Sequence, residues 1–319
     1  MQHVIRSQQF DRKTIEKLFA LATQLQTAPD DSLRGKVMAT LFYEPSTRTR
    51  LSFESAMTRL GGGVISTENA REASSAMKGE TLEDTIKIVN QYADVIVLRH
   101  FEAGSALHAA QVSQIPIINA GDGAGQHPTQ ALLDLYTIER ELGKVDGIHI
   151  AGVGDLRFGR TIRSLSYLLG KFKDVRMTFV SPPELQMGDD IKAYLKRNNV
   201  AFSETENLAS AMKSADVVYQ TRIQKERFPD VEEYERLKDS FIITRSLVDS
   251  MKRKAILMHP LPRVNEIERE VDSSPHAMYF KQAGYGVLVR MALLKMLLGG
   301  KELLPIPRVP ASHNLHGNV

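Results

Sequence analysis

The sequence predicts an α/β protein of two domains, each with a parallel β-sheet flanked by helices, and the two joined by interdomain helices. Short apolar runs recur, and each is followed by a polar turn and a segment with helical periodicity, which is the pattern of parallel α/β units. The length of 319 residues suits about two domains of roughly 150 residues each. The expected strands are 37–43, 93–100, 115–119, 148–154, 175–181, 215–221 and 254–260.

Three helices carry clear start or stop signals. One begins after Pro45, with Ser46 or Thr47 as its cap, and is stopped by a run of glycines. A second begins at Pro128, because proline is preorganised for the first helical turn. The third is the strongly apolar stretch 283–299, which glycines bound at its end. We expect the second helix to link the two domains, and the third is long enough to pack across both domains or to return to the first.

The polar, glycine-containing turn 143–147 separates the second helix from a new strand, so we place the domain boundary there. The first domain then covers residues 1–142 and is completed by the helix 283–299. The second domain covers residues 147–282. Prolines and few apolar side chains predict a poorly ordered tail over residues 300–319.

Composition excludes several classes of protein. The chain has no cysteine, which excludes a disulfide framework, a cysteine-based zinc site and a cysteine nucleophile. The formal net charge of +3 is spread along the chain, so we expect no nucleic-acid partner. No long apolar run predicts a membrane span. The polar, charged N-terminal segment has no apolar signal region, and we expect a cytoplasmic protein.

Polar and cationic residues follow the carboxyl ends of the predicted strands. In open parallel sheets, ligands bind at that edge. Four arginines from separate segments reach it, and several converging arginines indicate an anionic ligand. They are Arg48, Arg99, Arg160 and Arg222.

The segment after the first strand has the clearest local chemistry. A strand that turns into a helix start offers unpaired backbone N–H groups and the positive end of the helix dipole. Ser46, Thr47 and Thr49 add hydroxyl groups, and Arg48 adds a bidentate guanidinium. This combination predicts a phosphate site. The alternative is a merely capped helix with Arg48 and Arg50 in solvent.

His127 and Gln130 flank the start of the helix at Pro128, so both side chains can point beyond its N-terminus. A neutral imidazole there can donate a hydrogen bond to a carbonyl oxygen. The alternative is that His127 is only a cap or a surface residue. Arg160 begins another helix after the turn GVGDLRFG, whose spacing does not match a dinucleotide-binding loop; an ordinary surface arginine is the alternative here.

The polar stretch REASSAMKGETLEDT suits a mobile loop that closes on a substrate and carries Ser74 and Lys78. An exposed loop lysine without a function is the alternative. The turn MHPLPR can present backbone carbonyl oxygens up to Leu261. Metal-binding motifs and a serine nucleophile elbow are missing from the sequence, so we expect no metal, no cofactor and no covalent intermediate.

Together, ordered motifs spanning positions 42 to about 298 resemble the aspartate/ornithine carbamoyltransferase superfamily. The segments HPLPR and TRIQKER and the loop with Lys78 look like its aspartate branch. The ornithine branch typically has a cysteine in the motif that here reads HPLP, and this chain has none. The motifs are FYEPSTRTRLSFE, AMKGETLEDT, VLRH, HPTQALLDLYTI, GDLRFGRT, TRIQKER, MHPLPRVNEI and QAGYGVLVRMALL.

The resemblance implies roles for individual residues around carbamoyl phosphate. Its phosphate would be held by Ser46, Thr47, Arg48 and Thr49, with Ser74 from the loop. Arg99 would bridge the phosphate and the carbonyl oxygen, and His127 with Thr49 would polarise that carbonyl. The carbamoyl NH2 group would be oriented by Gln130 and the backbone carbonyls of Pro260 and Leu261, with Pro262 fixing the turn.

The resemblance also implies an aspartate site and an assembly. The carboxylates of L-aspartate would be gripped by Lys78, Arg160, Arg222 and Gln224. The loop with Ser74 and Lys78 would reach a neighbouring subunit, which implies a homotrimer with shared active sites. A separate regulatory chain is a further possible partner. The implied reaction is sequential carbamoyl transfer from carbamoyl phosphate to L-aspartate, an early step of pyrimidine biosynthesis.

Three other functions stay open at this point. A carbamoyltransferase for another acceptor, such as ornithine or an N-acylated amino acid, would keep the first-domain motifs and change the second-domain pocket. A noncatalytic relative that scaffolds other enzymes would be expected to lose some of Arg48, Arg99, His127 and Lys78, all of which are present. A nucleic-acid binder has only the slight positive charge in its favour.

Overall fold

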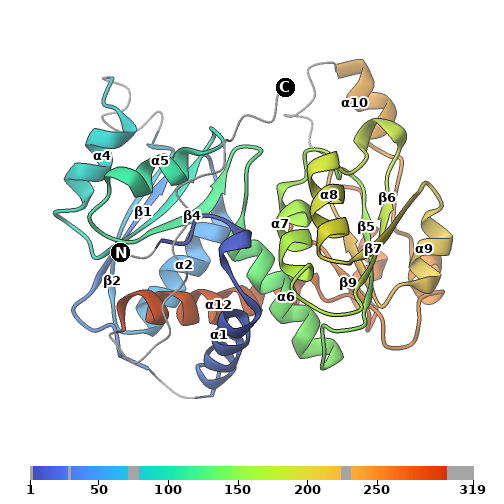
Figure 1. Ribbon diagram of the computed structural model, residues 1–319, viewed down its shortest axis with the longest axis horizontal. Coiled ribbons are helices and arrows are strands. Elements are labelled where there is room, and N and C mark those ends of the chain that lie inside the picture. Colours follow the sequence, from blue (N-terminus) through green and yellow to red (C-terminus); the bar gives the residue numbers. More distant parts are fainter. Residues whose placement is uncertain (1–2, 28–29, 71–78, 224–230, 300–319) are drawn as a thin grey trace. The chain divides into compact units, whose positions relative to one another are not determined.

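The chain forms two compact units, each built on its own parallel β-sheet (Figure 1). The computed structural model describes residues 3–27, 30–70, 79–223 and 231–299. The described residues up to Leu132 and from Gly286 onward form the first unit, and Leu133–Tyr285 forms the second. The predicted fold class is therefore confirmed.

The first unit contains a four-stranded sheet in the order β2-β1-β3-β4, with all neighbouring strands parallel. Its strands are β1 (Val37–Phe42), β2 (Gly63–Glu68), β3 (Val95–His100) and β4 (Ile117–Asp122). Its helices are η1 (Ser7–Gln9), α1 (Arg12–Gln24), α2 (Thr47–Arg59), α4 (Leu82–Val89) and α5 (Ser105–Val112), with part of α6 (Pro128–Leu142) and of α12 (Tyr279–Leu298).

Successive side chains of a strand point to opposite faces of the sheet, so the core of the first unit has two layers. Leu41 and Ile96 pack on one face with apolar residues of α4 and α5. Figure 1 places α2 and the end of α12 on the opposite side of this sheet. There Arg290 of α12 lies over the ring of Phe53 of α2, with 4.9 Å between the guanidinium carbon and the ring centre. Both faces of the central strands are thus covered.

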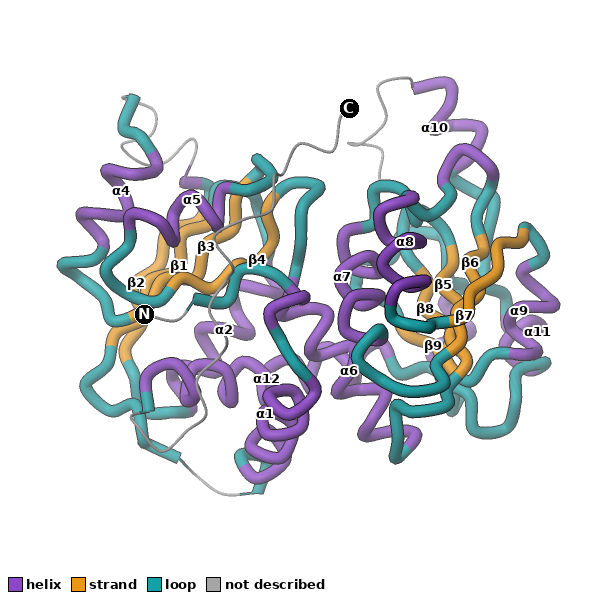
Figure 2. The backbone as a smooth tube through the Cα atoms, viewed as in Figure 1, coloured by secondary structure: helices purple, strands orange, loops and turns teal. Residues whose placement is uncertain are grey.

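The second unit contains a five-stranded parallel sheet in the order β7-β6-β5-β8-β9. Helices α9 and α11 cover one face, and α7 and α8 lie on the other (Figure 2). The strands are β5 (His149–Val153), β6 (Arg176–Val180), β7 (Ala201–Thr205), β8 (Val217–Gln220) and β9 (Ile256–Met258). The helices are α7 (Arg160–Leu169), η3 (Pro183–Leu185), α8 (Asp189–Arg197), α9 (Leu208–Ser214), α10 (Val231–Leu237), α11 (Arg245–Asp249) and η5 (Arg269–Ser273).

An aspartate anchors the amino edge of each sheet. In the first unit, Asp94 accepts hydrogen bonds from the backbone N–H of Val37 (2.8 Å) and from Lys36 Nζ (2.9 Å). In the second, Asp216 accepts from the backbone N–H of His149 (2.8 Å) and from Lys252 Nζ (2.7 Å). Each carboxylate precedes one strand and satisfies the first amide of the neighbouring strand, so it fixes where the two strands begin.

All seven predicted strands are present, and two further strands, β2 and β7, were missed. The chain passes between its two compact units inside α6 and inside α12, since each helix contributes residues to both units. The domain bounds expected from the sequence stay a prediction. The predicted tail lies outside the described residues. Among the residues that the structure describes, no helix is long and apolar enough to cross a membrane.

Asp216→Asn should lower the free energy of unfolding at pH 7 by about 1–2 kcal/mol, because the pair with Lys252 loses its charge. Burial alone would raise the pKa of Asp216, but the hydrogen bonds from Lys252 and from the His149 amide lower it. A lowered folded-state pKa stabilises the fold above the unfolded-state value of about 3.9 and loses that effect as pH falls. The difference between variant and wild type should therefore shrink below about pH 4.

Urea unfolding at pH 7, 5 and 3.5 measures this difference. The matched control is Asp249→Asn, since its carboxylate is 56% exposed and pairs with Arg245 at 2.8 Å on the surface. That control should change the free energy of unfolding by less than about 0.5 kcal/mol. Equal losses in both variants would refute an anchoring role for Asp216.

Candidate active site

The N-terminus of α2 lies directly after the carboxyl end of β1, where a phosphate site is predicted. Ser46 is the N-cap residue of this helix, and its side chain accepts no hydrogen bond from the helix amides. Thr47 and Arg48 are exposed, whereas Thr49 is buried. The first-turn N–H groups of a helix have no intrahelical acceptor and carry the positive end of the dipole. The structure therefore gathers all four predicted phosphate ligands at one helix start.

Arg99 lies at the next strand end, beside this helix start. It lies near the carboxyl end of β3, where it pairs in register with Phe42 of β1. Its Nη2 lies 3.4 Å from Glu44 Oε2, in the turn that leads into α2, and its Nη1 donates to the carbonyl of Ala120 at 3.3 Å. The side chain is only 14% exposed. These contacts direct the guanidinium to the carboxyl edge of the first sheet.

Arg50 serves the fold rather than the ligand site. Its Nη2 donates to Glu68 of β2 at 2.7 Å, and its Nη1 lies 3.3 Å from Glu54 of its own helix. The possibility that both Arg48 and Arg50 are solvated is therefore wrong for Arg50, which ties α2 to the edge strand. The two arginines of the STRTR motif thus differ in their surroundings although they stand two positions apart.

His127 and Gln130 are both buried at the start of α6, after the end of β4. The loop before them is held by Asp122, whose Oδ1 accepts from the Gln126 amide at 2.8 Å and from Asn119 Nδ2 at 3.0 Å. The other oxygen of Asp122 accepts from the amide of Gly104 at 2.8 Å. Sequence reasoning missed Asp122; the signal was the GDG sequence at the carboxyl end of β4.

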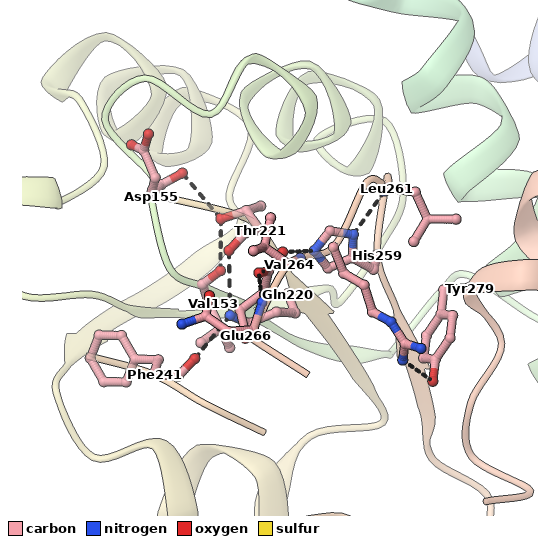
Figure 3. Close-up of polar contacts among 12 residues, drawn as sticks. Val153, Asp155, Gln220, Thr221, Phe241, His259, Leu261, Val264, Glu266 and Tyr279 are labelled. Carbon is pink, nitrogen blue, oxygen red and sulfur yellow. Dashed lines mark hydrogen bonds and ion pairs between the residues drawn. The ribbon is translucent and has the colours of Figure 1, made fainter. Parts of the chain in front are cut away.

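The second unit brings Arg160 and Arg222 to the carboxyl edge of its sheet. Thr221 joins the two loops that carry them, because its hydroxyl donates to the carbonyls of Val153 (2.8 Å) and Asp155 (3.3 Å), as Figure 3 shows. Gly154 has φ +104°, and a Cβ on it would lie 2.5 Å from the Thr221 carbonyl oxygen. Only glycine fits this approach. Both arginines are partly buried.

The turn after β9 holds Pro260, Leu261 and Pro262. Its Leu261–Pro262 peptide bond is cis, and Leu261 has φ +55°. A leucine in the left-handed region costs roughly 1–2 kcal/mol, so the surroundings must hold it there. The next residue, Arg263, is committed elsewhere, since Asp272 pairs with both ends of its guanidinium. The backbone of this turn is therefore the part that can meet a ligand.

Three predicted site residues, Ser74, Lys78 and Gln224, lie outside the described residues. Within the described part of the chain, no group of three or more His, Asp or Glu side chains could hold a metal ion. The remaining predicted residues divide into two sets. One lies at the strand ends and helix starts of the first unit, and the other is an arginine pair with a carbonyl-bearing turn in the second.

Comparison with known proteins identifies the family of this chain. A profile described as "Aspartate/ornithine carbamoyltransferase, carbamoyl-P binding domain" matches residues 2–140. A second, described as "Aspartate/ornithine carbamoyltransferase, Asp/Orn binding domain", matches residues 146–297. The chain belongs to the aspartate/ornithine carbamoyltransferase family.

Its relatives narrow this class to the aspartate branch. The chain is 58% identical over 303 residues to aspartate carbamoyltransferase 3, chloroplastic, of Pisum sativum, covering 93% of this chain and 78% of the pea protein. It is 52% identical over 307 residues to the aspartate carbamoyltransferase catalytic subunit of Methanocaldococcus jannaschii, covering 95% and 99%. The solved structure of Trypanosoma cruzi aspartate transcarbamoylase with carbamoyl phosphate and aspartate has a TM-score of 0.87 and 42% identity, covering 92% and 95%.

Arg48→Ala should weaken the binding of inorganic phosphate, because a charge-assisted hydrogen bond at the α2 N-terminus is lost. We expect the Kd to rise about ten- to a hundredfold, which corresponds to roughly 1.5–3 kcal/mol. Calorimetric titration of the full chain with inorganic phosphate measures the change.

The matched control is Arg34→Ala, which removes the same charge near the amino end of β1. The Arg34 side chain is 78% exposed and pairs with Asp31 at 2.8 Å. Its loss should change the Kd by less than about twofold, because exposed pairs contribute little and distant charges are screened. If both variants weaken phosphate equally, the site at α2 is disproved.

Proposed function

We propose that this chain transfers the carbamoyl group of carbamoyl phosphate to the amine of L-aspartate, giving N-carbamoyl-L-aspartate and phosphate in pyrimidine biosynthesis. The observation that carries the proposal is the α2 N-terminus with Arg48 beside it and Arg99 at the next strand end. The solved relative from T. cruzi, whose structure contains both substrates, supports it.

In this proposal the first unit binds and activates carbamoyl phosphate. Ser46, Thr47, Arg48 and Thr49 hold the phosphate, and Ser74 adds a hydroxyl. Arg99, His127 and Thr49 donate to the carbonyl oxygen. Gln130 and the carbonyl oxygens of Pro260 and Leu261 orient the NH2 group, with Pro262 fixing that turn.

Transfer proceeds by direct attack of the aspartate amine on the carbamoyl carbon. The new C–N bond forms, the C–O bond to phosphate breaks, and the departing phosphate takes the proton of the amine. Negative charge grows on the carbonyl oxygen and on the leaving group, where preorganised Arg, Lys and hydroxyl donors stabilise it most. A protein nucleophile is not required by this route.

The second unit selects the acceptor. Lys78, Arg160, Arg222 and Gln224 bind the two carboxylates of aspartate. Arg160 and Arg222 carry fixed positive charge on neighbouring strand ends, which suits a dicarboxylate and disfavours the cationic side chain of ornithine. The domains proposed from the sequence, 1–142 with 283–299 and 147–282, thus take carbamoyl phosphate and aspartate respectively.

We further propose a homotrimer in which Ser74 and Lys78 complete the active site of a neighbouring subunit. The first unit supports an assembly because it exposes large apolar side chains that a monomer leaves in water. They are Leu51, Ile65, Ile88 and Tyr92, which are 42–62% exposed. The name "catalytic subunit" of the M. jannaschii relative supports a separate regulatory chain as a further partner.

The proposed compartment is the cytoplasm, whereas the pea relative is chloroplastic by name. Fractionation of the source cells with an antibody against the chain decides between the two. Recovery in a plastid fraction would replace the cytoplasmic assignment and leave the proposed reaction unaffected.

The proposed reaction is tested by incubating the protein with carbamoyl phosphate and either L-aspartate or L-ornithine. A colorimetric assay measures the carbamoyl-amino-acid product. Turnover with aspartate alone is the expected result. Turnover with ornithine, or with neither acceptor in a correctly assembled sample, would overturn the proposal.

Arg222→Ala should raise the KM for aspartate about ten- to a hundredfold while the KM for carbamoyl phosphate stays nearly constant, since one charge-assisted contact to a carboxylate is lost. Arg157→Ala is the control, because Arg157 lies in the same unit but is exposed and stacks on Phe158. Initial rates with each substrate varied in turn give the two constants. A rise for carbamoyl phosphate alone would assign Arg222 to the other substrate.

Shared sites predict complementation between two inactive variants. Arg48→Ala and Lys78→Ala homotrimers should each have little activity, and mixed trimers should regain activity because some sites combine an intact Arg48 with an intact Lys78 of a neighbour. Subunit exchange followed by the activity assay, with sedimentation on the same sample, measures this. Mixed trimers as inactive as the parents would refute sharing.

A further inference from the structure

A buried histidine–glutamate pair supports the turn that carries Pro260 and Leu261. His259 directly follows β9, and its side chain is 1% exposed, while that of Glu266 is 5% exposed. His259 Nε2 lies 2.8 Å from Glu266 Oε1, and the backbone N–H of Leu261 donates to His259 Nδ1 at 2.7 Å (Figure 3). The imidazole therefore bridges the carboxylate and the turn.

The contacts of the imidazole fix its protonation. Since the Leu261 amide donates to Nδ1, that nitrogen carries no proton, and Nε2 carries the proton that it donates to Glu266. The other oxygen of Glu266 accepts from the amides of Val264 (2.9 Å) and Asn265 (3.1 Å). Burial alone would raise the pKa of Glu266, but the hydrogen bonds from His259 and the amides lower it, so the carboxylate stays charged.

The backbone of the histidine is held as firmly as its ring. The His259 amide donates to Gln282 Oε1 at 3.0 Å, and Gln282 Nε2 donates to Asp134 Oδ1 at 2.6 Å. Asp134 Oδ2 in turn accepts from the hydroxyl of Tyr219 in β8 at 2.7 Å. This buried chain of hydrogen bonds ties the start of the turn to α12, α6 and β8, so the imidazole is a fixed reference point for Leu261.

Leu261 needs such a reference point because its φ of +55° lies in the left-handed region that leucine rarely adopts. The hydrogen bond from its amide to His259 Nδ1 fixes the orientation of the peptide plane between Pro260 and Leu261. The direction of the carbonyls of Pro260 and Leu261 follows from this backbone conformation. The imidazole acceptor thus determines where the two carbonyl oxygens point.

We propose that His259 is a positioning residue for the carbamoyl NH2 group: its Nδ1 holds Leu261 in place, and Glu266 acts through it by selecting the tautomer. The proposal rests on the proposed function for what the turn binds, and on the contacts above for how the turn is held. Neither residue touches the substrate in this proposal. A hydrogen bond from one imidazole nitrogen to a carboxylate commonly sets the tautomer and the orientation of a functional histidine.

Two substitutions of His259 separate its two hydrogen bonds. His259→Asn places an amide oxygen near the position of Nδ1, so it keeps the acceptor for the Leu261 amide and loses the bond to Glu266. His259→Gln places an amide nitrogen near the position of Nε2, so it keeps the bond to Glu266 and loses the acceptor. We expect His259→Gln to raise the KM for carbamoyl phosphate about tenfold with a fall in kcat, and His259→Asn to lose clearly less.

Glu266→Gln tests the tautomer. Its amide oxygen can accept from the Val264 and Asn265 amides, which turns its NH2 group toward His259 Nε2. The imidazole must then accept a hydrogen bond at Nε2 and carry its proton on Nδ1. Two donors, the Nδ1 proton and the Leu261 N–H, then face each other, and the hydrogen bond to Leu261 is lost. We expect a loss similar to that of His259→Gln, and almost no further loss when Glu266→Gln is added to His259→Asn, because asparagine has no tautomer to select.

Hydrogen exchange of the Leu261 amide, without substrates, separates this proposal from the proposed function. Protection in wild type and in His259→Asn, with fast exchange in His259→Gln and Glu266→Gln at unchanged global unfolding, supports the positioning role whatever reaction the protein catalyses. Equal exchange of this amide in the two His259 variants overturns it. Equal catalytic losses in those variants, in a protein that does turn over aspartate, overturn it as well.

Discussion

The parallel direction of every paired strand is the constraint on which the site depends. The central strands of each sheet carry buried side chains on both faces, so functional groups gather at the carboxyl ends of the strands and in the segments that follow them. In the first unit, the carboxyl end of β3 supplies Arg99, and the segments after β1 and β4 supply Ser46 to Thr49 and His127. In the second, the segments that follow the strands supply Arg160, Arg222 and the turn at Leu261. Strand direction alone therefore brings residues that are far apart in the sequence to the same edge of their sheet.

The two edges of each sheet have different electrostatic tasks. At the amino edges, Asp94 and Asp216 pair with lysines and accept hydrogen bonds from the first amides of neighbouring strands. Their charges therefore fix where the strands begin. At the carboxyl edges, cationic groups face helix starts and turns. Arg48 and Arg50 differ within one motif, since Arg50 is bound by Glu54 and Glu68 and ties α2 to the edge strand, whereas Arg48 is exposed.

Elements that depend on a local sequence pattern could be predicted from the sequence. The seven predicted strands are apolar because helices cover them, whereas β2 and β7 were missed because these edge strands are largely exposed and lack a continuous apolar run. The helix starts after Ser46 and at Pro128 were predicted from residue types that favour these positions, although the Ser46 side chain makes no capping hydrogen bond. Asp122, His259 and Glu266 were missed as positioning groups because they act through backbone amides whose arrangement only the folded turn creates.

The most direct test of the proposed chemistry is a crystal structure of the chain with carbamoyl phosphate and succinate, which has the two carboxylates of aspartate but no amine to react. The proposal predicts phosphate oxygens within about 3 Å of the first-turn amides of α2 and of the Arg48 guanidinium, and succinate carboxylates at the same distance from Arg160 and Arg222. Phosphate bound away from α2, or succinate bound away from both arginines, would contradict it.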